Sequence, residues 1–78
     1  MKKAEIVVGA SYTDNKGSVR LVLAEGPDYR LYPNQDDHDC LRYQLLEKKR
    51  GPDKVGSIRN CTRTSFAAWA KAVVEKTS

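Results

Sequence analysis

The sequence is poor in the residues that most often carry catalysis or hold a metal. Its 78 residues include one histidine and two cysteines. Two cysteines cannot supply the ligand spacing of a zinc finger. No glycine-rich loop leads into a helix, so the phosphate-binding motif of nucleotide-binding folds is missing. No apolar run approaches the length that spans a membrane. These absences argue against most enzyme and membrane classes.

The length predicts one domain, residues 1–78. A chain of this size buries only about 60% of the surface that its unfolded form exposes. Its stability is then expected to be on the order of 3–5 kcal/mol. Such a core leaves little room for a deep active-site pocket. We therefore expect a protein that is not an enzyme and that holds no cofactor and no metal.

Charge is divided unevenly along the chain, whose net charge is +4. Residues 1–40 carry five basic and seven acidic side chains, whereas residues 41–78 carry nine basic and three acidic ones. An anionic partner would suit the second half, whether a nucleic acid or an acidic protein. A solvated basic turn is the alternative interpretation. The candidate binding residues are Lys48, Lys49, Arg50, Lys54, Arg59 and Arg63.

The N-terminus indicates where the chain works. Met1-Lys2-Lys3 resembles the start of a secretory signal, but the apolar stretch after it is too short and contains Glu5. We expect a cytoplasmic protein in a reducing compartment. Cys40 and Cys61 are then expected to be buried thiols rather than a disulfide.

Short β-strands are predicted over most of the chain, at residues 5–12, 19–24, 29–32, 41–45 and 54–61. The Asp14-Asn15-Lys16-Gly17 sequence between the first two is typical of a hairpin turn. Gly9 and Gly56 are expected to mark a bend or a bulge. In the fourth strand Leu41, Tyr43 and Leu45 share one face, and this clean alternation predicts the central strand.

The periodicity changes to that of a helix near the C-terminus. One helical face is formed by Phe66, Trp69, Ala70, Val73 and Thr77. Thr64 or Ser65 is expected to cap the first turn. The expected fold is mainly β with an α+β arrangement: a small antiparallel five-stranded sheet that curls into a partial barrel. Phe66 and Trp69 would plug its open apolar side.

The acidic run Asp36-Asp37-His38-Asp39-Cys40 holds metal-ligand side chains, but its spacing matches neither calcium loops nor zinc sites. We expect a solvated acidic loop. A small enzyme or metal protein that uses His38 with a cysteine stays an alternative.

Two sets of residues resemble a known group of proteins. Gly9, Tyr12, Gly17, Arg20 and Val22 give the spacing G-x-x-Y-x(4)-G-x-x-R-x-V, and Ser65-Phe66-Ala67-Ala68-Trp69-Ala70 ends the fold. The chain resembles small uncharacterised proteins of proteobacterial phages and prophages. That resemblance implies an SH3-like barrel with a terminal helix, and it carries over no catalytic or binding residue.

The resemblance also implies binding to host macromolecules, including inhibition of bacterial defence systems. The sequence thus predicts a small non-enzymatic interaction module that binds a bacterial protein or ribonucleoprotein. A nucleic-acid-binding protein that uses the basic residues of the second half is the alternative.

Overall fold

A curved antiparallel sheet, partly closed by one short helix, makes up the molecule. The computed structural model describes residues 1–49 and 54–74. The strands are β1 (Ser11–Thr13), β2 (Val19–Glu25), β3 (Cys40–Glu47), β4 (Ile58–Thr62) and β5 (Ala72–Val74). Their order is β4-β3-β2-β1-β5, with every neighbouring pair antiparallel.

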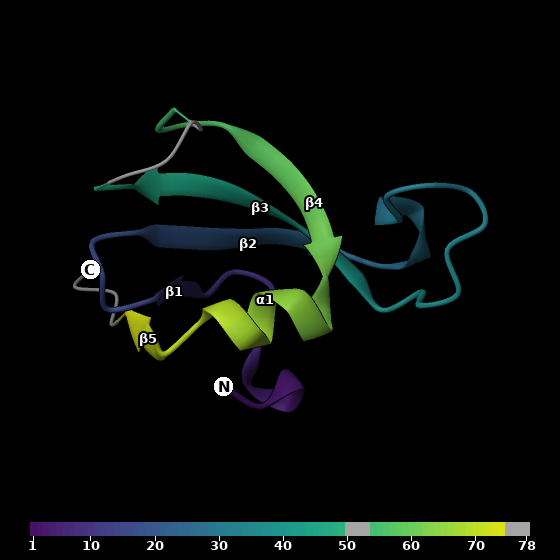
Figure 1. Cartoon of the computed structure of the whole chain (residues 1–78), viewed down its shortest axis with the longest axis horizontal. Helices are drawn as coiled ribbons and strands as arrows, with labels where there is room; N and C mark the ends of the chain where they lie inside the picture. Colours follow the sequence, from purple (N-terminus) through teal and green to yellow (C-terminus); the bar gives the residue numbers. More distant parts are fainter. Residues whose placement is uncertain (50–53, 75–78) are drawn as a thin grey trace.

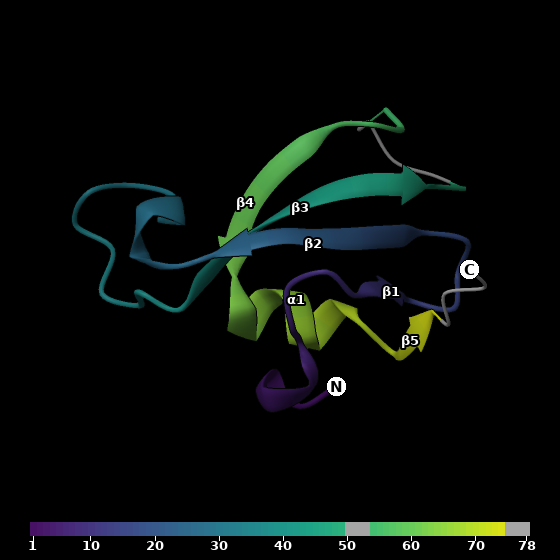
Figure 2. The same ribbon diagram turned by 180° about the vertical axis from the view of Figure 1, so that it is seen from behind.

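Helix α1 (Arg63–Trp69) connects β4 to β5 and lies across the concave side of the sheet (Figure 1). Two 3-10 turns, η1 (Lys3–Glu5) and η2 (Pro27–Tyr29), precede β1 and follow β2. The view from behind shows β4 bending away from β3 toward the helix (Figure 2). The predicted fold is confirmed: a small α+β, SH3-like partial barrel of five antiparallel strands with one helix near the C-terminus.

The turn between β1 and β2 is built as its sequence predicts. Asp14 Oδ1 accepts hydrogen bonds from the N–H groups of Lys16 (2.8 Å) and Ser18 (3.3 Å). Asn15 and Gly17 adopt positive φ angles of 63° and 100°, which tight hairpins require. Burial alone would raise the pKa of Asp14, but the backbone hydrogen bonds outweigh it and lower the pKa.

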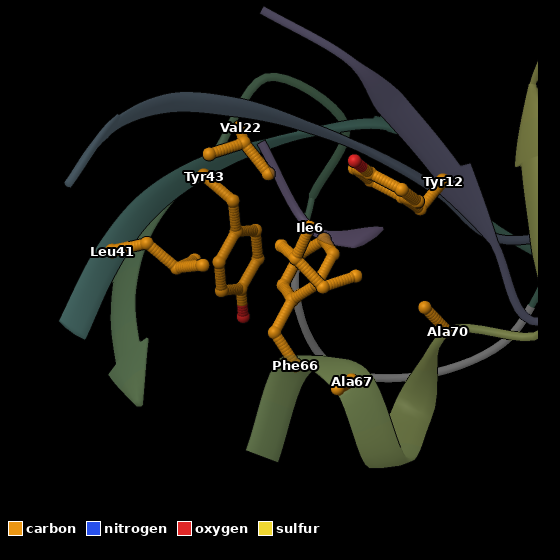
Figure 3. Packing of buried hydrophobic residues seen from close by; sticks show 8 residues of the cluster. All are labelled: Ile6, Tyr12, Val22, Leu41, Tyr43, Phe66, Ala67 and Ala70. Carbon is orange, nitrogen blue, oxygen red and sulfur yellow. The ribbon is translucent and has the colours of Figure 1, made fainter. Parts of the chain in front are cut away.

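Phe66 is the centre of the core and is fully buried. The centroid of its ring lies 5.5 Å from that of Tyr12, in an edge-to-face contact, and 5.7 Å from that of Tyr43. Figure 3 shows Phe66 reaching from α1 toward the side chains of the sheet. The predicted plug is confirmed for Phe66, whereas Trp69 is only half-buried at the edge of the core. The buried cluster comprises Ile6, Tyr12, Val22, Leu41, Tyr43, Phe66, Ala67 and Ala70.

The predicted first strand is shorter than expected, because most of residues 5–12 serve another purpose. Tyr12 Oη donates to the Glu5 carbonyl (2.6 Å) and accepts from the Val7 N–H (2.9 Å), so the N-terminal segment folds back over Tyr12. Gly9, with φ of 90°, makes the predicted bend. Only at Ser11 does β1 begin.

The helix prediction is correct at its start and wrong at its end. The cap is Thr62, whose hydroxyl accepts from the Ser65 N–H (3.1 Å), rather than Thr64 or Ser65. The helix stops at Trp69, and Val73 lies in β5 opposite Tyr12. The β-branched pair after Ala72 favours a strand, and the open edge of β1 supplies the hydrogen-bond partners that stop the helix. Thr77 lies outside the described residues.

Two further strand predictions need correction. Residues 29–32 form no strand, because Pro27 begins η2 and a polar loop follows. The strand predicted at 54–61 starts only at Ile58, since Gly56 occupies a turn with φ of 94°. The prediction that residues 41–45 form the central strand is wrong, because β2 is the middle strand of the sheet; β3 is paired on both sides and buries Leu41, Tyr43 and Leu45 on one face as predicted.

Candidate binding surface

Lysines from distant parts of the sequence meet at one end of the sheet, which we call the basic end. The β1–β2 turn, the end of β3 and the start of β5 all lie there (Figure 1). The pairing of Val19 with Glu47 places the β1–β2 turn beside the residues that follow β3. The basic end is formed by Lys16, Lys48, Lys49, Lys54 and Lys71.

The β1–β2 turn is packed tightly against the residues that follow β3. A Cβ atom at Gly17 would come within 2.7 Å of Lys49 Cβ, so the aliphatic stem of Lys49 lies directly on the glycine. Lys71 is held nearby, because its N–H donates to the Thr13 carbonyl (2.8 Å). Packing and hydrogen bonding therefore fix the backbone at Lys49 and Lys71, and both side chains are exposed, with Lys71 Nζ donating to the Ala68 carbonyl (3.5 Å).

Three of the predicted binding residues lie at the basic end: Lys48, Lys49 and Lys54. Arg59 is exposed and lies within β4, opposite Tyr43, rather than at the end of the sheet where the lysines lie. Arg50 lies outside the described residues. Lys16 and Lys71 were missed from the sequence, because one belongs to the acidic half of the chain and the other lay in the predicted helix. The hairpin register is the signal that could have found Lys16.

Arg63 lies at the far end of β4 and is engaged inside the fold. Its side chain is 13% exposed and forms ion pairs with Glu25 (2.5 Å) and Asp39 (2.8 Å). It also donates to the Ile6 carbonyl. The hydrogen bond to Asp39 raises the pKa of Arg63 against the opposing effect of burial. The structure thus separates Arg63 from the predicted lysines and uses it to fasten α1 to three other segments.

One arginine that was not predicted as a binding residue lies beside the basic end. Arg20, on β2, places its guanidinium over the rings of both Trp69 and Tyr43. The sequence signal for this role is the alternation that puts Arg20 on the same face of β2 as buried Val22. That signal is misleading, because a charged residue in a strand normally indicates an exposed face.

The loop between η2 and β3 has a fixed shape. Gln35 is buried, and its Oε1 accepts from the Leu31 N–H (2.9 Å) while its Nε2 donates to the Asp37 carbonyl (2.7 Å) and to Cys40 Sγ (3.0 Å). These bonds hold Leu31 and Tyr32 in solvent, with exposed fractions of 59% and 58%. The loop projects from the end of the sheet opposite the basic end (Figure 1).

The two cysteines are free thiols, as predicted, with Cys40 buried and Cys61 half-buried. Burial raises the pKa of Cys61 to about 11. Only about one molecule in ten thousand would then carry the Cys61 thiolate at about pH 7. His38 is exposed. Among residues 1–49 and 54–74, no group of three or more His, Cys, Asp or Glu side chains could hold a metal ion.

No family model, no curated protein and no solved structure matches this chain. In the described part of the chain, no helix has the length and apolar character needed to cross a membrane.

Proposed function

We propose that this protein is a small non-enzymatic interaction module of phage or mobile-element type that works in the bacterial cytoplasm. Its partner is a bacterial protein or ribonucleoprotein, which it binds through the basic end and inhibits. The observation that carries the proposal is the convergence of five lysines from separated segments onto one end of the sheet, with Lys49 packed against Gly17.

This arrangement suits recognition of a broad anionic surface. Lysine is a compact charge on a flexible stem, so a group of lysines selects for charge rather than for one hydrogen-bonding geometry. Their summed potential speeds association with an anionic partner and weakens as salt is added. Asp14 and Glu47 also lie at this end, but the five lysines outnumber these two carboxylates.

The opposite end of the molecule supports a partner that contains protein. Leu31 and Tyr32 are large, exposed and held in place by Gln35. Tyrosine is enriched among the residues that dominate protein interfaces, and a loop that is already ordered loses little entropy on binding. A ribonucleoprotein would offer an anionic surface to one end and a protein surface to the other.

Direct nucleic-acid binding remains the second candidate, and the addition of Lys16 and Lys71 to the predicted lysines favours it. Five lysines that neutralise phosphates on duplex DNA would give log affinity against log salt a slope of about −4 to −5. A partner that is purely protein would be captured equally well after nuclease treatment.

The test is affinity capture from a bacterial lysate at low and high salt, with and without nuclease. Charge reversal by Lys48→Glu and Lys49→Glu together is expected to abolish capture at low salt. The matched control reverses Lys2 and Lys3, an exposed pair in the N-terminal segment. If the control reduces capture as much as the test variant does, or if neither changes it, the basic end is not the binding surface.

A further inference from the structure

The guanidinium of Arg20 contacts two aromatic rings that come from different elements. Its Cζ atom lies 4.1 Å from the centre of the Trp69 ring on α1 and 4.7 Å from that of Tyr43 on β3. Each such contact is an electrostatic attraction between the cation and the electron-rich face of the ring. Two rings in contact with one guanidinium restrict its orientation more than a single contact would.

Within residues 1–49 and 54–74, no hydrogen bond engages the guanidinium of Arg20. Its Nε atom is buried, and the described residues offer it no hydrogen-bond partner. The two terminal nitrogens are not buried in this way and reach solvent. Arg63 shows the contrast, because its guanidinium contacts two carboxylates and a carbonyl. Within the described chain no carboxylate forms an ion pair with Arg20.

A half-buried guanidinium without a carboxylate is costly for a structural residue, because its charge is partly desolvated without compensation. The same arrangement suits a binding group. The rings fix the orientation in advance, so less entropy is lost when a ligand arrives. A ligand would approach the terminal nitrogens, because Nε is buried. An oxyanion with two oxygens in the guanidinium plane fits these nitrogens.

We propose that Arg20 binds a phosphate group, as a specific subsite beside the basic end. Arg20 pairs with Leu45 in the sheet, and Lys48 and Lys49 follow the strand that contains Leu45, so the subsite adjoins the segment that carries these lysines. This inference rests on the proposed function, because the lysines supply the field that favours phosphate. In a ribonucleoprotein the phosphate belongs to the RNA backbone.

The sequence contains a single tryptophan, Trp69, so its fluorescence reports this subsite directly. The probes are inorganic phosphate, a short single-stranded oligouridylate and acetate, each at constant ionic strength. We expect a saturable change of Trp69 emission with phosphate and with the oligonucleotide, and none with acetate. Arg20→Lys keeps the charge but loses the planar two-nitrogen edge, so it should weaken oligonucleotide binding at least about tenfold.

Arg30→Lys is the matched control, since Arg30 lies in the loop at the opposite end. Because Arg20→Lys also removes ring contacts, a second measurement uses the wild-type protein alone. The buried Nε–H of Arg20 should give a slowly exchanging NMR signal that shifts on addition of phosphate. Lys48→Glu with Lys49→Glu should weaken the oligonucleotide much more than inorganic phosphate, whose response should remain saturable, which separates failure of the subsite from failure of the basic end.

Three results would overturn the proposal. The first is an Arg20 Nε–H signal that phosphate leaves unmoved. The second is an oligonucleotide affinity that Arg20→Lys and Arg30→Lys change equally. The third is a response to acetate as strong as that to phosphate, which would assign the subsite to carboxylates of an acidic protein instead.

Discussion

Three arginines show how surroundings decide what one side chain does. Arg63 is nearly enclosed and bound to carboxylates, so it fastens elements together. Arg42 is exposed and donates to Asn60 Oδ1 (3.0 Å). Its Cζ atom lies 4.9 Å from the centre of the Tyr29 ring. Arg20 contacts two aromatic rings and, among the residues that the structure describes, no carboxylate. Of the three, Arg20 leaves its hydrogen-bonding edge to a ligand.

Phe66 is the side chain whose truncation should cost most. It is fully buried and contacts Tyr12, Tyr43 and Trp69. Phe66→Ala is expected to lower the free energy of unfolding by about 3–5 kcal/mol, which is comparable to the whole stability of so small a domain. Urea denaturation of the variant and of the milder Phe66→Leu measures this. A loss below about 1 kcal/mol in Phe66→Ala would show that Phe66 is not central to the core.

Cys61 should make stability fall in alkaline solution. Burial raises its pKa from 9.0 to about 11. Between these values the unfolded chain loses the thiol proton while the folded chain keeps it. The free energy of unfolding therefore falls as pH rises above about 9 and levels off above about 11. Because the thiol is only half-buried, the effect should be about 1–2 kcal/mol.

Cys61→Ala should remove this part of the alkaline loss. The comparison is between the slopes of unfolding free energy against pH, which are insensitive to the constant cost of the lost side chain. Wild type and variant curves that run parallel from about pH 8 to 11 would contradict the assignment to Cys61.

At the scale of elements, local patterns were informative where one face is buried and misleading where pairing decides. The alternation of Leu41, Tyr43 and Leu45 predicted β3 because side chains on one face of a strand share one environment. Val73 fitted the helical period equally well, but the open edge of β1 draws its segment into β5. Such pairing between distant segments leaves no local signal in the sequence.

The contact between the β1–β2 turn and the end of β3 can be tested at Gly17. Gly17→Ala introduces a methyl group 2.7 Å from Lys49 Cβ at a φ of 100°. Gly56→Ala is the control, since Gly56 has a similar φ of 94° but nothing within 4 Å of its added Cβ. Both should lose about 1 kcal/mol to backbone strain, and Gly17→Ala should lose about 1–2 kcal/mol more to overlap.

Thermal or urea unfolding of the two glycine variants measures this difference. Equal losses would mean that the stem of Lys49 moves aside at no cost. The basic end would then not be a packed structure.

At the scale of the whole molecule, the candidate site could be predicted only in part. Lys48, Lys49 and Lys54 adjoin one another in sequence, so a count of charges found them. Lys16 and Lys71 reach the same end through sheet pairing, which composition does not reveal. Arg63 belongs to the same basic half of the sequence, but it lies at the far end of β4, where it pairs with Glu25 and Asp39. Distance along the chain was a poor guide to distance on the surface.

A cationic surface that recognises an anionic partner by charge should also bind a dense polyanion, so the salt dependence of binding to a short DNA duplex tests the basic end most directly. With five lysines neutralising phosphates, log affinity should fall against log salt with a slope of about −4 to −5. Lys48→Glu with Lys49→Glu should reduce the magnitude of this slope by at least about 2, and the same change at Lys2 and Lys3 should leave it unaltered. A flat dependence, or a slope that both double variants change alike, would contradict the account.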